Sequence, residues 1–432
     1  MITTTMPHWL QQCMPSTEGD RWLAAYRQQH WNDFLTSGLP TRNHERWKYA
    51  DLSFVSTLDA ACADDASQRN IADIIHAHAF TSEDSLLLVM VNGVFVPALS
   101  QMQHLPREVV LCRLKEAFVT HQAIVAAHWK RFANDDTCAV SKWNAALFHD
   151  GLFMHVPDDC HITQPIQVLN IVNVSAGKVI YPRHLMVLGK RSKLTILEEC
   201  VVDTANSILT NSATAIEVGE EAQLDYCKLQ ASASQAMVLA NTCIHQQQNS
   251  RVALTHFNIS GQFIREEVCV KLNGAGAECM TSGLSDLKET KQFSDFHIDV
   301  EHMAPHSRSD MLFKGVIDQH SRAVFNGRLH VLPNVQKISA YQANHNLLLS
   351  KQAEAYSKPE LEIYSDDVKC KHGATTGQLD DDALFYLRAR GIDRAEAVKM
   401  LLVGFTDDIV ERVPSSIKSH VRHQLNQQGS AK

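Results

Sequence analysis

Cys370 and His372 are the two side chains of this chain whose types and spacing best match half of a metal site. They stand two positions apart in LEIYSDDVKCKHGATTGQLDDDALFYLRARGI, at residues 361–392. On an extended backbone such side chains point to the same side, so a thiolate and an imidazole can converge on one metal atom. A four-ligand centre needs further donors from elsewhere in the fold or from another chain. An arbitrary Cys-x-His pair is more often a buried cysteine beside a hydrogen-bonded histidine.

Three helices are predicted directly after this pair. The first spans about residues 380–390 and ends at Gly391, a common C-terminal breaker. Asp393 and Glu396 have the spacing of a capping box at the start of the second helix, AEAVKMLLVGF. The third, SSIKSHVRHQLNQQ, follows Pro414. The acidic residues at 366–367 and 380–382 are interpreted first as residues at a helix N-terminus, where a negative charge interacts favourably with the helix dipole.

Apolar residues of these helices have two possible roles. Packing against the rest of the chain is the simpler role, and a docking surface for another protein is the alternative. The residues concerned are Leu384, Phe385, Leu387, Val398, Leu401, Leu402 and Phe405.

A period-two apolar pattern covers about residues 155–350 and divides into strand-turn-strand units. The turns recur at intervals of 30, 30, 24, 32 and 29 residues and are marked by Gly189, Gly219, Asn249, Asn273, Pro305 and Asn334. Near-constant intervals of this length are typical of solenoid proteins, because stacked units share one continuous core. The pattern predicts a β-solenoid, in particular a parallel β-helix. A jelly roll is the alternative.

The first third of the chain has mainly helical spacing. Residues 20–40 and 69–80 carry apolar residues at helical intervals and end in turn signals. Asn92 and Gly93 lie between two short apolar runs, the strongest short-range signal for a hairpin. Residues 107–133 return to helical spacing. The predicted fold is therefore mainly β: a right-handed parallel β-helix at about 141–360, between helical regions at 1–140 and 361–432.

Composition limits the classes of protein to consider. The chain has 40 Lys and Arg against 48 Asp and Glu, a net charge of −8, which makes nucleic acid an improbable main partner. No apolar run approaches the ~20 residues needed to span a bilayer, and the first residues lack a secretory signal pattern. Eleven cysteines at irregular intervals indicate reduced thiols and a cytoplasmic location. Cys200, Cys227 and Cys269, on predicted strands, are interpreted as core residues.

Motifs for catalysis and nucleotide binding are absent from the sequence. It contains no GxxxxGK[ST], and no GxGxxG between a strand and a helix. It also contains no GxSxG, HExxH or credible catalytic triad signature. We therefore expect no catalytic residues and no nucleotide site in this chain. An extracellular β-helix enzyme acting on polysaccharide is a rival, but the predicted repeats carry no recurring carboxylates at equivalent strand positions.

Three segments resemble the SufB/SufD family of scaffold subunits in the SUF iron-sulfur cluster assembly machinery. The longest contains KCKHGATTG followed by FYLRARGI. GLPTRNHERWKYADL at 38–52 resembles the family's N-terminal motif, and WNAALFHDGLFMHVP at 143–157 is a weaker match. SufB sequences have an acidic residue after the histidine and a CxxC-type cluster near the start. This chain has Gly373 and no such cluster, so within the family it is more similar to SufD.

The resemblance implies a scaffold without ATPase activity. It implies that His372 faces a SufB cysteine across a heterodimer interface at the end of the β-helix, where a nascent iron-sulfur cluster is held transiently. Cys370 has a supporting role or is a second ligand. The C-terminal helices are expected to bind SufC, the ABC-type ATPase, which hydrolyses ATP. A homodimer and a purely structural role in the complex are alternatives, and the sequence does not decide whether a flavin binds the complex.

Overall fold

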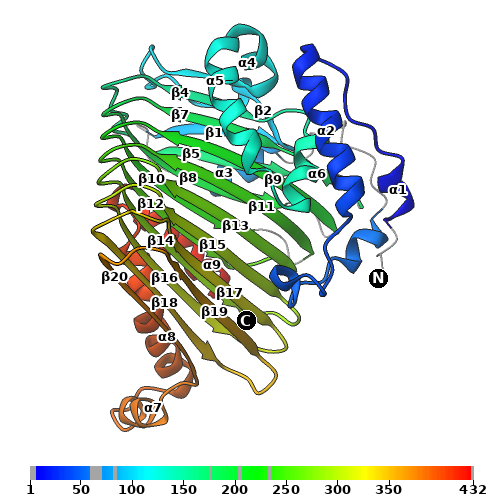
Figure 1. Cartoon of the computed structure of the whole chain (residues 1–432). Coiled ribbons are helices and arrows are strands. Elements are labelled where there is room, and N and C mark those ends of the chain that lie inside the picture. Colours follow the sequence, from blue (N-terminus) through cyan, green and yellow to red (C-terminus); the bar gives the residue numbers. More distant parts are fainter. Residues whose placement is uncertain are drawn as a thin grey trace.

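The computed structural model describes residues 6–58, 71–80, 85–174, 177–202, 207–231 and 235–429. Its centre is a β-solenoid of about seven turns, with helices packed on both sides (Figure 1). The prediction of a mainly β protein with a solenoid core and helical ends is confirmed. Consecutive coils pair in parallel along the solenoid, which rules out the antiparallel jelly roll.

Each coil contributes one strand to each of two sheets. Sheet one has ten strands, in the spatial order β2, β1, β5, β8, β10, β12, β14, β16, β18 and β20. Their bounds are β1 Leu86–Val91, β2 Val94–Phe95, β5 Ile166–Val172, β8 Lys193–Val202, β10 Gln223–Gln230, β12 Arg251–Asn258, β14 Glu278–Leu287, β16 Arg308–Ile317, β18 Ile338–Leu348 and β20 Val368–Gly377. Strands of sheet one therefore also lie outside residues 141–360.

Sheet two runs from β19 at the last coil to β3 at the first. Its strands are β3 Val110–Arg113, β4 Leu152–Val156, β6 Val179–Ile180, β7 Arg183–Leu188, β9 Ile208–Val218, β11 Ala236–Gln246, β13 Phe263–Leu272, β15 Phe293–His302, β17 Arg322–Val331 and β19 Glu354–Ile363. The six predicted strand-turn-strand units correspond to β7–β8, β9–β10, β11–β12, β13–β14, β15–β16 and β17–β18.

One corner of the solenoid explains the repeat. A residue with positive φ recurs there at intervals of 30, 28, 27, 30 and 31 residues: Arg191, Glu221, Asn249, Gly276, His306 and Lys337. The backbone N–H of each of the first five donates to a carbonyl in the same turn of the next coil. The turns therefore stack as the strands do, and the predicted turn markers all lie in this corner.

The interior between the sheets is apolar at this corner. Alternate residues of each strand point inward, including Ile196, Leu224, Leu254, Val270 and Phe313, and form one continuous buried cluster. The first coil carries the predicted hairpin: Asn92 and Gly93, both with positive φ, connect β1 to antiparallel β2.

Helices of the N-terminal region cover the outer face of sheet two at its first coils (Figure 1). They are α1 His8–Gln11, α2 Arg21–Ser37, α4 Leu114–Thr120, α5 Gln122–Phe132 and α6 Ala139–Leu147, with 3-10 turns η1 Glu45–Trp47, η2 Ser53–Thr57 and η4 Ala133–Asp135. The 3-10 turn η3 Pro97–Leu99 lies instead beside β1 of sheet one. Phe34 stacks on Trp143, and this pair packs against Leu209 and Leu239 of the sheet. Helix α3, Ile71–His78, packs instead on sheet one.

The prediction of helix throughout residues 107–133 is wrong at its start, because Val110–Arg113 forms β3 and pairs with β4. The sequence EVVLCR is rich in β-branched and apolar residues, and the sheet edge satisfies its backbone. The first two residues of the predicted helix at 69–80 lie outside the described ranges.

The C-terminal helices are α7 Asp381–Arg388, α8 Arg394–Glu411 and α9 Ser415–Gly429. Asp380 and Asp393 cap α7 and α8 as predicted, since each side chain accepts two backbone N–H bonds. Ile409, Val413 and Ile417 pack on the outer face of sheet one. The helices thus lie alongside the solenoid and leave its last coil uncovered (Figure 1).

Candidate functional site

Strand β20, the last of sheet one, holds both residues singled out from the sequence. It pairs in parallel with β18, which places Cys370 beside Ala340 and His372 beside Gln342. The backbone is extended, so both side chains lie on the face that continues the solenoid interior. The structure therefore brings the two together as the spacing predicted, and it supplies no third metal-ligand side chain beside them among the described residues.

Cys370 and His372 differ in exposure. The Cys370 side chain is half-buried against the interior cluster, and this burial raises the pKa of its thiol. His372 is exposed. His372 is thus free to meet a ligand from outside the chain.

Gln342 lies one strand below His372 and is buried, with only 3 % of its surface exposed. Neither atom of its side-chain amide has a hydrogen-bond partner within the described ranges. Gly327 provides the space for this amide, because a Cβ there would lie 2.8 Å from Gln342 Oε1. A buried amide without partners is uncommon and marks this end of the interior as an unusual polar position.

The last coil is an open end of the solenoid. Strand β20 pairs only with β18, and β19 only with β17, so one edge of each strand has no strand partner among the described residues. Tyr364, just after β19, is 60 % exposed. Unpaired strand edges are ready to bind another chain.

The solenoid interior also holds charges that sequence reasoning missed. Lys228 Nζ lies 3.0 Å from Glu266 Oε2, and Tyr226 donates a hydrogen bond to Glu198. Burial acts to lower the pKa of Lys228, but Glu266 and Glu198 hold it above its usual value. The sequence could have indicated these buried charges, because Tyr226 and Lys228 follow Leu224 at intervals of two residues and therefore face the interior as Leu224 does.

The three cysteines interpreted as core residues have different environments. Cys227 is buried between sheet one and α9, as predicted. Cys200 lies half-buried in the polar part of the interior, near Asn170 and Glu198. Cys269 lies on the outer face of sheet two and lines a pocket, so the interpretation as a core residue is wrong for it.

The segment GLPTRNHERWKYADL binds the outer face of sheet two near the open end. Arg46 Nη1 lies 2.9 Å from Asp299 Oδ2, and the ring of Trp47 lies 3.8 Å from the guanidinium carbon of Arg265. Lys358 of β19 pairs with Glu45 at 2.6 Å. The segment therefore fastens the N-terminal region to coils far along the chain.

No helix in the described part of the chain is long and apolar enough to cross a membrane.

Comparisons with known proteins agree with the architecture. Residues 171–405 match the family model "SUF system FeS cluster assembly, SufBD core domain", and residues 12–168 match "SufBD protein N-terminal region". An iron-sulfur cluster assembly SufBD family protein of Synechocystis is 29 % identical over 95 % of this chain and 92 % of its own length. The iron-sulfur cluster assembly protein SufD of Escherichia coli is 28 % identical over 93 % of this chain and 92 % of its own length.

A third relative, the iron-sulfur cluster assembly protein SufB of Bacillus subtilis, is 23 % identical over 69 % of this chain and 64 % of its own length. Similarity thus extends further along the SufD chain than along the SufB chain. The two family models together cover both the N-terminal region and most of the solenoid. The chain belongs to the SufBD family of iron-sulfur cluster assembly proteins.

Proposed function

We propose that this chain is a SufD-type scaffold subunit of the cytoplasmic SUF complex, without ATPase activity, and that it pairs with a SufB-type subunit through its open solenoid end. The observation that carries the proposal is the last coil, where His372 is exposed beside strand edges that have no strand partner in the part of the chain that the structure describes. The extent of the similarity favours a SufD-type subunit, because the match to the Escherichia coli SufD protein covers 93 % of this chain and 92 % of that protein.

The chemistry at this end suits a shared and temporary site. Iron-sulfur clusters are bound mainly by thiolates, and imidazole is a workable ligand. His372 and Cys370 cannot complete the coordination of a nascent cluster, so the remaining ligands come from the partner. Separation of the two subunits then removes ligands and allows the cluster, which is the product of the complex, to leave.

The proposed division of labour follows the three parts predicted from the sequence. Residues 1–140 supply the helices that cover the solenoid and also its first strands, β1 to β3, residues 141–360 form most of its coils, and residues 361–432 carry the site strand and the docking helices. The last part therefore couples an ATPase partner to the end of the solenoid that holds the site.

Pairing through the open end is tested by Tyr364→Asp. A buried carboxylate without a counter-ion opposes association, and we expect binding to a co-expressed SufB-type subunit to weaken at least about 100-fold. Size-exclusion chromatography with light scattering measures the loss. Val119→Asp, on the 80 % exposed side chain of α4, is the matched control and should leave pairing intact. Equal pairing by both variants would refute the proposed interface.

Docking of a SufC-type ATPase is expected on α7 and α8. Four large apolar side chains are exposed there, Phe385, Tyr386, Met400 and Val403, and Phe385 is 74 % exposed. Phe385 was among the residues for which internal packing and a docking surface were both considered, and it is exposed to solvent. Exposed aromatic residues of this kind are typical interface anchors.

Phe385→Asp is expected to weaken ATPase binding at least about 30-fold, because an aromatic anchor typically contributes about 2 kcal/mol or more. Isothermal titration with the purified ATPase measures the affinity. The Val119→Asp control keeps its affinity if the surface is specific. Unchanged affinity in Phe385→Asp would place the docking surface elsewhere.

A further inference from the structure

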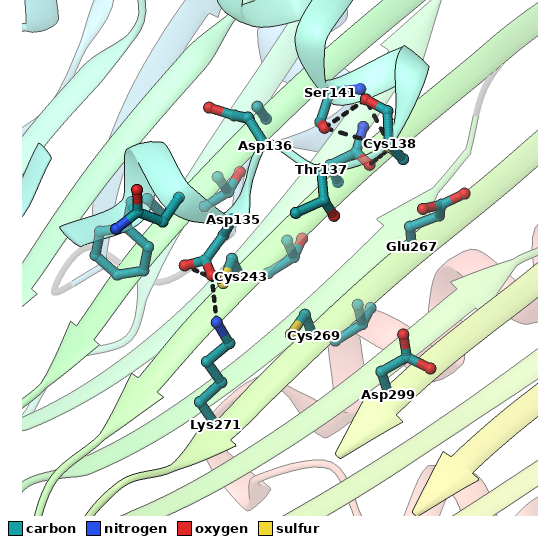
Figure 2. A pocket seen from close by; sticks show the side chains of 18 of the residues that line it. Asp135, Asp136, Thr137, Cys138, Ser141, Cys243, Glu267, Cys269, Lys271 and Asp299 are labelled. Carbon is teal, nitrogen blue, oxygen red and sulfur yellow. Dashed lines mark hydrogen bonds and ion pairs between the residues drawn. The ribbon is translucent and has the colours of Figure 1, made fainter. Parts of the chain in front are cut away.

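A pocket of about 410 Å³ lies between the outer face of sheet two and the segment that joins α5 to α6. It is remote from β20 in sequence and belongs to the other sheet. Figure 2 shows Asp135 extending from this segment toward the sheet, where Cys243, Cys269 and Lys271 lie on adjacent strands. Nothing in the proposed function uses these side chains.

Three different metal-ligand types meet in this pocket. Asp135 Oδ2 lies 2.9 Å from His245 Nε2 and 3.3 Å from Cys243 Sγ. All three donor atoms lie within 4.8 Å of one another. Four-coordinate zinc has ligand bonds of about 2.0–2.3 Å, which correspond to edges of about 3.3–3.8 Å between neighbouring donors. The separation of Asp135 Oδ2 and Cys243 Sγ, 3.3 Å, falls in this range, and that of Asp135 Oδ2 and His245 Nε2, 2.9 Å, is somewhat shorter.

Cys269 is our choice of fourth donor, although its Sγ lies outside the set of three donor atoms that are within 4.8 Å of one another. It is the register partner of Cys243 on the neighbouring parallel strand, and both side chains point to the outer face. Two other candidates in the pocket are engaged elsewhere. Cys138 accepts the N-cap bond of α6 from Ser141, and Asp299 pairs with Arg46 and Arg328.

His245 lies between an aromatic ring and a carboxylate. Its ring stacks on Phe132, with the centroids 4.3 Å apart. Its second nitrogen, Nδ1, is buried and makes no hydrogen bond in the described part of the chain, and it faces Glu217 Oε2 at 3.9 Å. That carboxylate oxygen is likewise buried without a hydrogen bond. A carboxylate behind the outer nitrogen of a histidine is the usual second layer of a metal site.

The simpler interpretation is an ion pair between Asp135 and Lys271, which are in contact through Asp135 Oδ1. This contact leaves Oδ2 to the other donors, so it does not exclude an ion. Two thiolates, one carboxylate and a divalent ion sum to a charge of −1, and the ammonium of Lys271 neutralises it. The lysine therefore completes the charge balance of a loaded site.

We propose that Asp135, Cys243, His245 and Cys269 form a four-coordinate site for a borderline-soft divalent transition ion of the Zn²⁺ and Fe²⁺ class. The donor set excludes Mg²⁺ and Ca²⁺, which require oxygen ligands. Glu217 orients His245 from behind. The site is independent of the interface at β20 and does not rest on the proposed pairing.

Anaerobic titration of the reduced, chelator-treated full chain with Co²⁺ tests the proposal. We expect one ion per chain, with the visible absorption of tetrahedral Co²⁺ and a near-ultraviolet thiolate-to-cobalt charge-transfer band. Zn²⁺ should displace Co²⁺, and Fe²⁺ competition shows whether the site also takes iron. In Cys243→Ser the charge-transfer band should fall, and in Glu217→Gln the affinity should drop about 10–100-fold.

Cys370→Ser is the control that separates this site from the open end, and its cobalt spectrum should equal that of the wild type. Asp135→Asn, a change of nearly equal size in the segment between α5 and α6, provides a second variant if Cys243→Ser does not fold, and it should also lose affinity. Absence of the charge-transfer band in the wild type would overturn the proposal. A band that survives in Cys243→Ser but disappears in Cys370→Ser would overturn it as well.

Discussion

His372→Ala is expected to remove most of the iron and acid-labile sulfide from the complex co-purified with SufB-type and SufC-type subunits, while the complex itself stays assembled. His372 is an exposed side chain on an edge strand, so its removal leaves no cavity and no buried unpaired group. If its imidazole is a ligand, the nascent cluster loses one coordination position that water replaces poorly. Iron and sulfide are measured per complex under anaerobic conditions.

Lys371→Ala is the matched control, because Lys371 is exposed on the same strand and points to the opposite face. We expect its iron and sulfide content to equal that of the wild type. Cys370→Ser should give a partial loss if the half-buried thiol only supports the site. Unchanged content in His372→Ala, with an intact complex, would make this chain a purely structural partner and move the cluster site elsewhere.

The solenoid could be predicted from the sequence because its repeat is local. Each coil needs a tight turn at the same corner, and residues that accept positive φ, such as Asn249, mark that corner at nearly constant intervals. The alternation of apolar and polar residues then shows which side chains of each strand face the interior, because one face of each strand must be buried. The Cys370 and His372 pair was found for the same reason, because two residues on one strand form a local pattern.

The pocket on sheet two could not be predicted in this way. Asp135 is 108 residues from Cys243 and 110 from His245 in sequence. Parallel stacking alone aligns Cys243 with Cys269, but the approach of Asp135 depends on how α5 and α6 pack on the sheet. Side-chain spacing within a segment carries no information about that approach. The C-terminal helices show the same limit: their apolar faces were evident, but the surface that receives them was not.

The attachment of the N-terminal segment leads to the second large prediction. Arg265→Met is expected to lower the free energy of unfolding by about 3–5 kcal/mol, the usual cost of removing one partner from a buried ion pair. The Arg265 side chain is buried between Asp295 and Glu267, with Trp47 stacked on its guanidinium. Methionine retains much of the volume but leaves two carboxylates without their cation. Urea unfolding with a common slope measures the change.

The pH dependence separates charge from packing as the cause. Burial acts to raise the pKa of Glu267, but Arg265, His297 and Arg46 hold it down at about 2, and the pKa of Asp295 is lowered as well. In the wild type this stabilisation is fully present above the unfolded pKa of about 4.5 and is lost as pH falls toward 2. In Arg265→Met the carboxyls lose their strongest cation, so they bind protons at higher pH.

The stability difference between wild type and Arg265→Met should therefore shrink as pH is lowered from 7 to about 4, since a protonated carboxyl needs no counter-ion. The double variant Arg265→Met with Asp295→Asn should recover part of the loss at pH 7 for the same reason. A difference that does not change with pH would assign the loss to packing against Trp47.

Whether charge or packing is the cause, the segment at 38–52 loses its contact with Arg265 on β13, the strand that also carries Cys269 and Lys271 of the proposed metal pocket. The Arg265→Met variant should therefore also bind Co²⁺ more weakly if Arg265 helps to position that pocket.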